Sequence, residues 1–135
     1  MKKIVMMLMC ASLFISCTTS KKEAEGGKEL MGTEWKIVVA NGQAVEMGEE
    51  GQPTFALNEK EVYGATGCNN YFGAYTLEGE KLSFAQMGAT QRMCVDMATE
   101  KNILSALEQV ASYKVEAEKA YLYDAAGVCV MELAK

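Results

Sequence analysis

The sequence contains no histidine and only one arginine, one proline and one tryptophan. The missing histidine excludes the Ser/His and Cys/His pairs that most often activate a nucleophile near neutral pH. Carboxylates occur in pairs at Glu49-Glu50 and at Glu78 with Glu80, but these residues lie in predicted turns, where charges are usually solvated. We therefore expect the protein not to be an enzyme and to have no catalytic residue.

Metal-ligand patterns are also scarce. The chain has no Cys-x-x-Cys pair, and a structural zinc site needs a tetrahedral set of nitrogen, sulfur or oxygen ligands. A cuprous ion could be held by Met87, Met93, Cys94 and Met97, because soft sulfur ligands suit it. Methionines beside the start of a helix more often fill gaps in a core. The sequence therefore predicts no metal site and no cofactor.

Basic residues are outnumbered by acidic ones, and the formal net charge is −5 with a pI of about 4.8. Proteins that bind nucleic acids show basic patches that neutralise phosphates. The same shortage disfavours an anionic ligand held by a basic cluster. We expect no nucleic-acid partner, and no small-molecule substrate can be identified.

No hydrophobic run is long enough to cross a membrane. The longest, Ile4 to Ile15, falls short of the roughly 20 residues that a spanning helix needs. Two lysines precede this run and Ser16-Cys17 follows it, which is the order of a secretory signal that ends in a lipobox. The pattern predicts a lipoprotein signal peptide over residues 1–16 and lipidation of Cys17.

Cys10 is the competing lipidation site, but it follows bulky Met9 and would leave a short apolar core. The other alternative is ordinary secretion with Cys17 unmodified. After Cys17, residues 17–28 are polar and read as a flexible linker. A lipid anchor would make the membrane a partner and place the protein in the cell envelope, as an outer-membrane lipoprotein that faces the periplasm or the cell surface.

From Leu30 onward, short segments of β-forming residues alternate with turn signals such as Asn41-Gly42. The predicted strands are residues 35–40, 54–57, 62–63, 71–77, 81–84, 113–117, 120–123 and 128–133. Glu78-Gly79-Glu80 is predicted to join two of these strands as a three-residue hairpin loop.

One segment has the spacing of an amphipathic helix instead. Asp96 is the predicted N-cap, and the inward positions are Glu100, Ile103, Leu104, Leu107, Val110 and Ala111. Many short strands with a single helix indicate an α+β domain. We expect a strongly curved antiparallel sheet, a partial barrel of about seven or eight strands, packed around one α-helix.

Several motifs in residues 29–134 resemble one known family. They are Leu30-Met31-Gly32-Thr33-Glu34-Trp35, Asn41-Gly42, Pro53-Thr54-Phe55, the block from Gly64 to Tyr75, and Thr90-Gln91-Arg92-Met93-Cys94. Together they resemble the META domain family, which includes the HslJ-type heat-shock lipoproteins of bacteria, and they assign a META domain to residues 29–135. The motif residues are Trp35, Gly67, Cys68, Asn69, Gly73, Tyr75, Thr90, Met93 and Cys94.

This resemblance implies a curved antiparallel sheet around one helix, an envelope location and a link to stress or antibiotic tolerance, with no established enzymatic activity. Two residues depart from the pattern: Arg92 stands one place later than the family's arginine, and Cys129 is not part of it. Residues 21–25 (Lys-Lys-Glu-Ala-Glu) resemble the acidic sorting signals of Bacteroidetes surface lipoproteins, although a solvated linker explains the same composition.

The cysteines allow two structural interpretations. In an exported chain Cys68 and Cys94 tend to oxidise, and their disulfide would contribute about 3 to 4 kcal/mol in the chain-entropy model. The alternative is two free thiols packed in the core. Cys129 alternates with Met131 and Leu133 and is predicted to be apolar core.

Polar residues near these cysteines have structural explanations too. Arg92 could lower the pKa of the Cys94 thiol or bind an anion, but an ion-paired surface side chain is the default. Asn69 and Asn70 suit turns, because asparagine side chains bond to nearby backbone, although a polar binding role stays open.

The sequence thus favours a non-enzymatic, lipid-anchored envelope protein, with a role in stress response or as an interaction partner that pairs through exposed β edges. The alternative is a carrier of a small apolar ligand or lipid on the concave face of the sheet. Its pocket would be lined by Tyr71, Phe72, Tyr75, Tyr121 and Tyr123. A third hypothesis, an inhibitor of a protease or lytic enzyme, needs a protruding rigid loop, for which residues 48–53 are the candidate.

Overall fold

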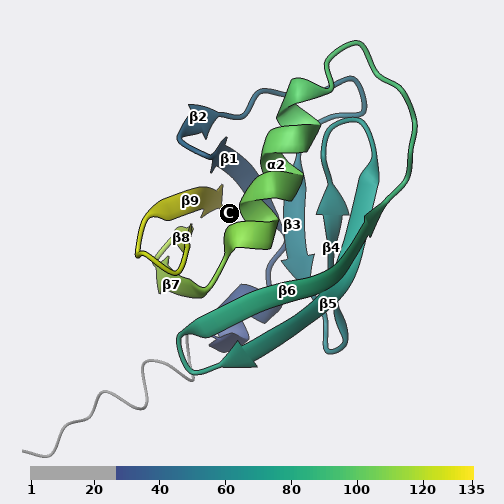
Figure 1. Ribbon diagram of the computed structural model, residues 1–135. Coiled ribbons are helices and arrows are strands. Elements are labelled where there is room, and N and C mark those ends of the chain that lie inside the picture. Colours follow the sequence, from purple (N-terminus) through teal and green to yellow (C-terminus); the bar gives the residue numbers. More distant parts are fainter. Residues whose placement is uncertain (1–26) are drawn as a thin grey trace, which may run out of the picture.

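The computed structural model describes residues 27–135 (Figure 1). The predicted signal peptide, Cys17 and most of the predicted linker lie outside these residues. The strands are β1 (Trp35–Ala40), β2 (Gln43–Ala44), β3 (Thr54–Leu57), β4 (Glu61–Ala65), β5 (Asn70–Glu78), β6 (Lys81–Ala89), β7 (Ser112–Glu116), β8 (Lys119–Tyr123) and β9 (Cys129–Ala134). One helix, α2 (Ala98–Gln109), stands between β6 and β7, and residues 27–31 are also helical.

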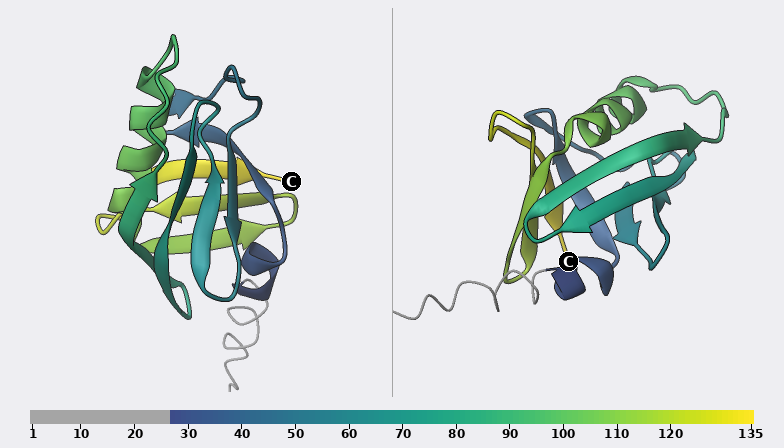
Figure 2. Two further views of the ribbon diagram at one scale, coloured as in Figure 1. Left: turned by 90° about the vertical axis from the view of Figure 1, so that its right-hand side faces the viewer. Right: turned by 60° about the horizontal axis from the view of Figure 1, so that its bottom comes forward.

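All neighbouring strands pair antiparallel, in the order β2-β1-β3-β4-β5-β6-β7-β8-β9. Because β1 also pairs with β9, the sheet curves into a ring, which Figure 2 shows from two further sides. The helix α2 contacts β9, β6 and β1 and lies across one side of this ring (Figure 1). The expected α+β architecture is confirmed, with nine strands because the two-residue β2 joins the sheet.

The ring has one weak seam. Strands β6 and β7 share a single paired position, Lys81 with Ser112, followed by a hydrogen bond from Leu82 N to Ala111 O. Beyond that point β6 continues to Ala89 without a further paired position on this side among residues 27–135. The helix α2 lies beside this free edge (Figures 1 and 2).

Two tight turns show how local sequence fixes the strand register. Asn41 and Gly42 both have positive φ, as a two-residue hairpin turn between β1 and β2 requires. The β5–β6 loop was predicted to have three residues, but Glu78 pairs with Lys81 and only Gly79 and Glu80 form the loop. Gly79 provides the positive φ at which a side chain would be strained, so the shorter turn forms.

Apolar side chains fill the interior of the ring. Its largest fully buried side chains include Trp35, Phe55, Tyr71, Leu82, Ile103, Leu107, Leu122, Met131 and Leu133. The helical residues 27–31 close one end, because Leu30 is fully buried and its carbonyl accepts a 3.1 Å hydrogen bond from Trp35 Nε1. Polar linker composition gave no sign of this short helix.

The helix α2 begins slightly differently from the sequence prediction. Its N-cap residue is Met97, whereas Asp96, the predicted cap, lies one residue earlier and accepts a 2.8 Å hydrogen bond from the Ala98 N–H. The inward spacing is confirmed for Glu100, Ile103 and Leu107, all buried. No helix within residues 27–135 has the length and hydrophobicity needed to cross a membrane.

A β-bulge corrects the prediction for Cys129. Tyr123 pairs with Cys129 and Leu122 with Met131, so β9 holds one extra residue, Val130, between these two pairs. The bulge reverses the alternation of faces, and Val130 is buried while Cys129 is only half-buried. Cys129 is therefore not core, although strict alternation predicted it to be.

Candidate functional site

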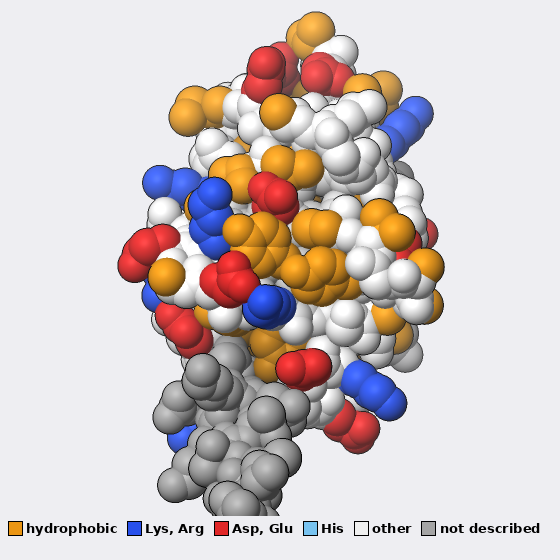
Figure 3. Space-filling view, turned by 90° about the vertical axis from the view of Figure 1, so that its left-hand side faces the viewer, with side chains coloured by type: hydrophobic (Ala, Val, Ile, Leu, Met, Phe, Trp, Pro, Cys, Tyr) orange, Lys and Arg blue, Asp and Glu red, His pale blue; other side chains and the backbone are white. Residues whose placement is uncertain are grey.

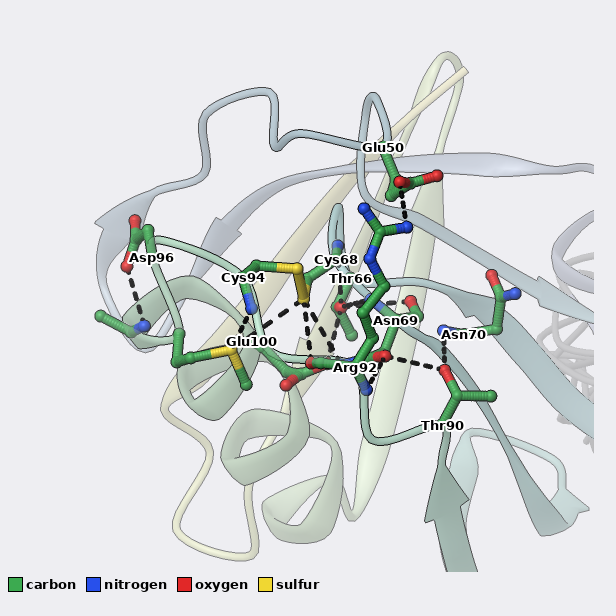
Figure 4. Close-up of a disulfide and its surroundings, with 12 residues drawn as sticks. Glu50, Thr66, Cys68, Asn69, Asn70, Thr90, Arg92, Cys94, Asp96 and Glu100 are labelled. Atoms are coloured by element: carbon green, nitrogen blue, oxygen red, sulfur yellow. Dashed lines mark hydrogen bonds and ion pairs between the residues drawn. A yellow bond between two sulfur atoms is a disulfide. The ribbon is translucent and has the colours of Figure 1, made fainter.

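The motif cysteines meet at one end of the molecule, where Cys68 and Cys94 form a disulfide across 26 positions of sequence. Cys68 follows the end of β4, and Cys94 lies in the segment between β6 and α2 (Figure 4). We call residues 64–70 together with residues 90–97 the disulfide corner. Of the two interpretations of these cysteines, the structure has the disulfide and not two free thiols.

Asn69 ties the two halves of the corner together without any ligand. Its Oδ1 accepts hydrogen bonds from Thr90 Oγ1 at 2.9 Å and from the Arg92 N–H at 2.7 Å. Its Nδ2 donates to the Arg92 carbonyl at 2.9 Å and approaches Cys68 Sγ at 3.4 Å. Since Asn69 is only 4% exposed, these bonds replace water, and its role is structural.

Thr66 and Glu100 connect the corner to the helix. Both side chains are buried, and Thr66 Oγ1 lies 3.0 Å from Glu100 Oε1. The same hydroxyl accepts hydrogen bonds from the Asn69 N–H at 2.9 Å and the Cys68 N–H at 3.3 Å. Sequence reasoning placed Glu100 on the inward face of the helix but gave no sign of Thr66 as its partner, because the two are far apart in the chain.

A third segment, the loop of residues 48–53, is bound down on the corner. Arg92 forms an ion pair with Glu50, and the Glu50 N–H donates to the Gly67 carbonyl at 2.9 Å. Gly48 and Gly67 pack so closely that a Cβ on Gly48 would collide with the Gly67 backbone. These contacts hold the loop rigidly against the disulfide corner.

The other motif residues support the sheet elsewhere. Trp35 is core, and Tyr75 donates a 2.6 Å hydrogen bond to the Asn58 carbonyl. Gly73 leaves room for the Met87 side chain, which a Cβ would strike. Of the motif residues, the structure brings together at the corner Gly67, Cys68, Asn69, Thr90, Met93 and Cys94.

Apolar side chains project into solvent from the two loops that the disulfide and the Arg92–Glu50 ion pair hold. Met47 is 72% exposed, Met93 82% and Val95 94%. A cleft of about 270 Å³ lies between Met47 and Val95, with the disulfide and the carboxylates of Glu46, Glu49 and Asp96 also in its lining. We call Met47, Met93 and Val95 the apolar tip. Sequence reasoning missed this feature, because exposure of single apolar residues cannot be read from a loop sequence.

A larger groove of about 560 Å³ lies on the other side of the corner, between α2 and the chain from Met87 to Met93. This volume falls within the roughly 300–1,000 Å³ of small-ligand pockets, whereas the cleft at the apolar tip is smaller. Its lining is Asn69, Met87, Gly88, Ala89, Thr90, Gln91, Arg92, Met93, Met97, Glu100, Leu104 and Glu108.

The aromatic residues proposed to line a carrier pocket do not converge on one. Tyr71 is buried, its hydroxyl donates to the Thr54 carbonyl at 2.6 Å, and burial raises the pKa of this phenol far above its usual range. Phe72 is half exposed, while Tyr121 and Tyr123 lie on the outer side of β8. On that side apolar and charged side chains are interspersed (Figure 3). The concave interior that a carrier would use is filled by the core.

The remaining chemistry of the described chain is limited. Cys129 is a free thiol, and burial raises its pKa, which keeps it in the less reactive protonated form. Residues 27–135 hold no cluster of three or more Cys, Asp or Glu side chains arranged to share a metal ion. Around the disulfide, the asparagine, threonine and arginine side chains bond to the protein itself, which suits a rigid scaffold.

Comparisons with known proteins agree with this architecture. The META domain family matches residues 28–135. A structure solved by NMR is 20% identical with a TM-score of 0.62, and the match covers 79% of this chain and 92% of that chain. An NMR structure of a protein from Burkholderia xenovorans is 24% identical with a TM-score of 0.60, covering 79% and 83% of the two chains. At these identities the likeness shows the fold alone. No protein of curated function matches the chain.

Proposed function

The chain belongs to the META domain family, and we propose that it acts as a non-enzymatic, lipid-anchored module of the cell envelope that binds another protein through its apolar tip. The observation that supports this proposal best is the exposure of Met47, Met93 and Val95 on loops held by a disulfide and an ion pair. Exposed apolar groups on rigid loops bind with little loss of conformational entropy. A role in stress response rests on the resemblance to HslJ-type heat-shock lipoproteins.

The placement of the termini supports the same function. Residues 27–31 lie at the end of the domain opposite the segment of residues 90–97 (Figures 1 and 2). A lipid on Cys17 would therefore attach the domain at the end opposite the apolar tip, which leaves the tip free to meet a partner. Strand addition at the edges of β1 and β9 has less support, because these two strands pair with each other. The carrier alternative also has less support, because core side chains fill the interior of the ring that a ligand would occupy.

The anchor is tested by changing Cys17 to alanine. We expect the unchanged protein to fractionate with membranes and the Cys17→Ala protein to lose that association, because acyl chains contribute about 0.8 kcal/mol per buried methylene. Cys10→Ala is the matched control and should behave like the unchanged protein. Globomycin, which blocks lipoprotein signal cleavage, should cause the precursor to accumulate. Unchanged processing together with unchanged fractionation of Cys17→Ala would refute the anchor.

The binding surface is tested by a photo-crosslinking residue placed at Val95. Val128, which is 59% exposed and lies between β8 and β9, serves as the matched control. We expect a discrete protein adduct from position 95 in intact cells and none from position 128. A chain with Met47→Gln and Met93→Gln should lose about tenfold or more of the Val95 adduct, because its apolar contacts are gone. Equal adducts from both positions would show that the tip is not a specific surface.

A further inference from the structure

The 560 Å³ groove lies along the unpaired edge of β6, at the end of the strand away from its one pairing with β7. The free edge of β6 reaches Met87, Gly88 and Ala89, and these residues line the groove on one side. Glu100, Leu104 and Glu108 of α2 line the other side. A strand edge without a partner presents backbone donors and acceptors that an extended chain can satisfy.

The walls of the groove are mainly apolar. Met87, Met93, Met97 and Leu104 contribute side chains to it. Methionine is flexible and polarizable, so surfaces rich in it adapt to different apolar side chains. These walls fit the alternate side chains of an extended segment.

One buried carboxylate gives the groove a charge preference. Glu100 is only 7% exposed and lines the groove. Among residues 27–135 its one side-chain partner is Thr66 Oγ1, 3.0 Å from Oε1, and the single proton of that hydroxyl also lies within reach of the Asn69 carbonyl at 3.1 Å. The Oε2 of Glu100 is left for a further donor. Glu108 adds a second carboxylate, while Arg92, which also lines the groove, is paired with Glu50. The groove is therefore apolar with excess negative charge, which complements an apolar segment that carries a cation.

We propose that this groove binds an extended segment of a partner protein, which adds to the free edge of β6 and places a lysine or arginine side chain against Glu100. The residues beside that cation are apolar and contact the methionines. This inference rests on the proposed interaction function and adds to it the chemistry of the segment that is recognised. It assigns recognition to a second surface, next to the apolar tip.

The test uses full-length protein in detergent and a pooled library of synthetic peptides with the 9-residue length of β6. Apolar and threonine residues alternate, and the central residue is lysine, arginine, norleucine or glutamate. We expect enrichment of the lysine and arginine peptides and at least about tenfold tighter binding of the lysine peptide than of its norleucine analogue, as a charge-assisted hydrogen bond provides. No enrichment, or no preference for a basic centre, would overturn the proposal.

Two further measurements separate the groove from general attraction to an acidic protein. In Glu100→Gln, which keeps an acceptor for Thr66, the preference for lysine over norleucine should fall to within about twofold, whereas the exposed control Glu78→Gln should retain it. On unchanged protein, two N-methylated forms of the peptide are compared, each methylated at one of the two alternate sets of amides. One form should lose binding and the other should keep it, because only every second amide of an added strand faces the edge of β6. A lysine preference that survives Glu100→Gln overturns the proposal.

The Val95 adduct reports on the apolar tip and the peptide library reports on the groove, and the two surfaces share only Met93. A specific Val95 adduct combined with no peptide enrichment would leave the interaction function supported and the groove inference wrong. Enrichment of basic peptides without a Val95 adduct would support the groove as the binding surface and would contradict the proposal that the apolar tip binds a partner.

Discussion

Replacing Cys68 and Cys94 together by alanine is expected to lower the free energy of unfolding by about 3.5 kcal/mol. The bond closes a loop across 26 positions, and the chain-entropy model assigns a loop of that length this stabilisation. The measurement is urea denaturation of the unchanged protein and of the double alanine variant, monitored by an optical signal. The denaturant slope should also rise, because the unfolded chain without its cross-link exposes more surface.

Cys129→Ala is the matched control for the disulfide. This thiol is half-buried and makes weak contacts with the backbone of Met131, at 3.4 Å, and of Leu122, so its loss should cost less than about 1 kcal/mol. A loss of under about 1 kcal/mol for the double alanine variant would contradict the prediction. It would mean that hydrogen bonds and packing alone hold the disulfide corner.

Asn69→Ala is expected to be the second most damaging change at the corner, at about 3 kcal/mol. It removes the acceptor for Thr90 Oγ1 and for the Arg92 N–H, together with the donor to the Arg92 carbonyl. A buried backbone group left without a partner costs about 1 to 3 kcal/mol, and partial access of water to residues 90–92 limits the sum. Thermal and urea unfolding measure the loss.

The neighbouring Asn70 provides the control for Asn69. Its side chain is exposed, and the bonds that join Asn70 to Thr90 use the Asn70 backbone, which alanine retains. Asn70→Ala should therefore stay within about 0.5 kcal/mol of the unchanged protein. Equal losses of stability in the two variants would show that water replaces the hydrogen bonds of Asn69 and that these bonds do not hold the corner together.

Local sequence predicted the elements of this fold well. The strand at Trp35, the Asn41-Gly42 turn and the inward face of α2 each follow from a periodicity or a backbone preference that adjacent residues carry. The curved sheet with one helix followed from the number and length of these elements. The features that could be predicted are those that residues close together in the sequence determine.

The features that were missed depend on distant parts of the chain. The bulge at Val130 changes the face of Cys129 because β8 and β9 pair out of phase there, and alternation within β9 cannot show it. The short helix at Leu30 exists because Trp35 and the core cover it. Period and propensity do not encode such tertiary contacts.

The candidate site divides in the same way. The cysteines and Asn69 are recognisable as a motif, but their partners are not. Thr66 meets Glu100, and Glu50 meets Arg92, across long stretches of chain that only the closed ring brings together. The apolar tip and the groove are properties of surface shape, which a linear pattern does not contain.

The pairing of β1 with β9 also sets a condition on how this protein is made. Lys36 pairs with Ala134, so β1 cannot complete its hydrogen bonds until Ala134 has left the ribosome. Pairings so distant in sequence close slowly, because the entropy of the intervening loop is lost before the contact forms. Until then β1 exposes apolar residues and an open edge. The nascent chain is therefore open to chaperones until β9 has been synthesised, and only then can the ring close.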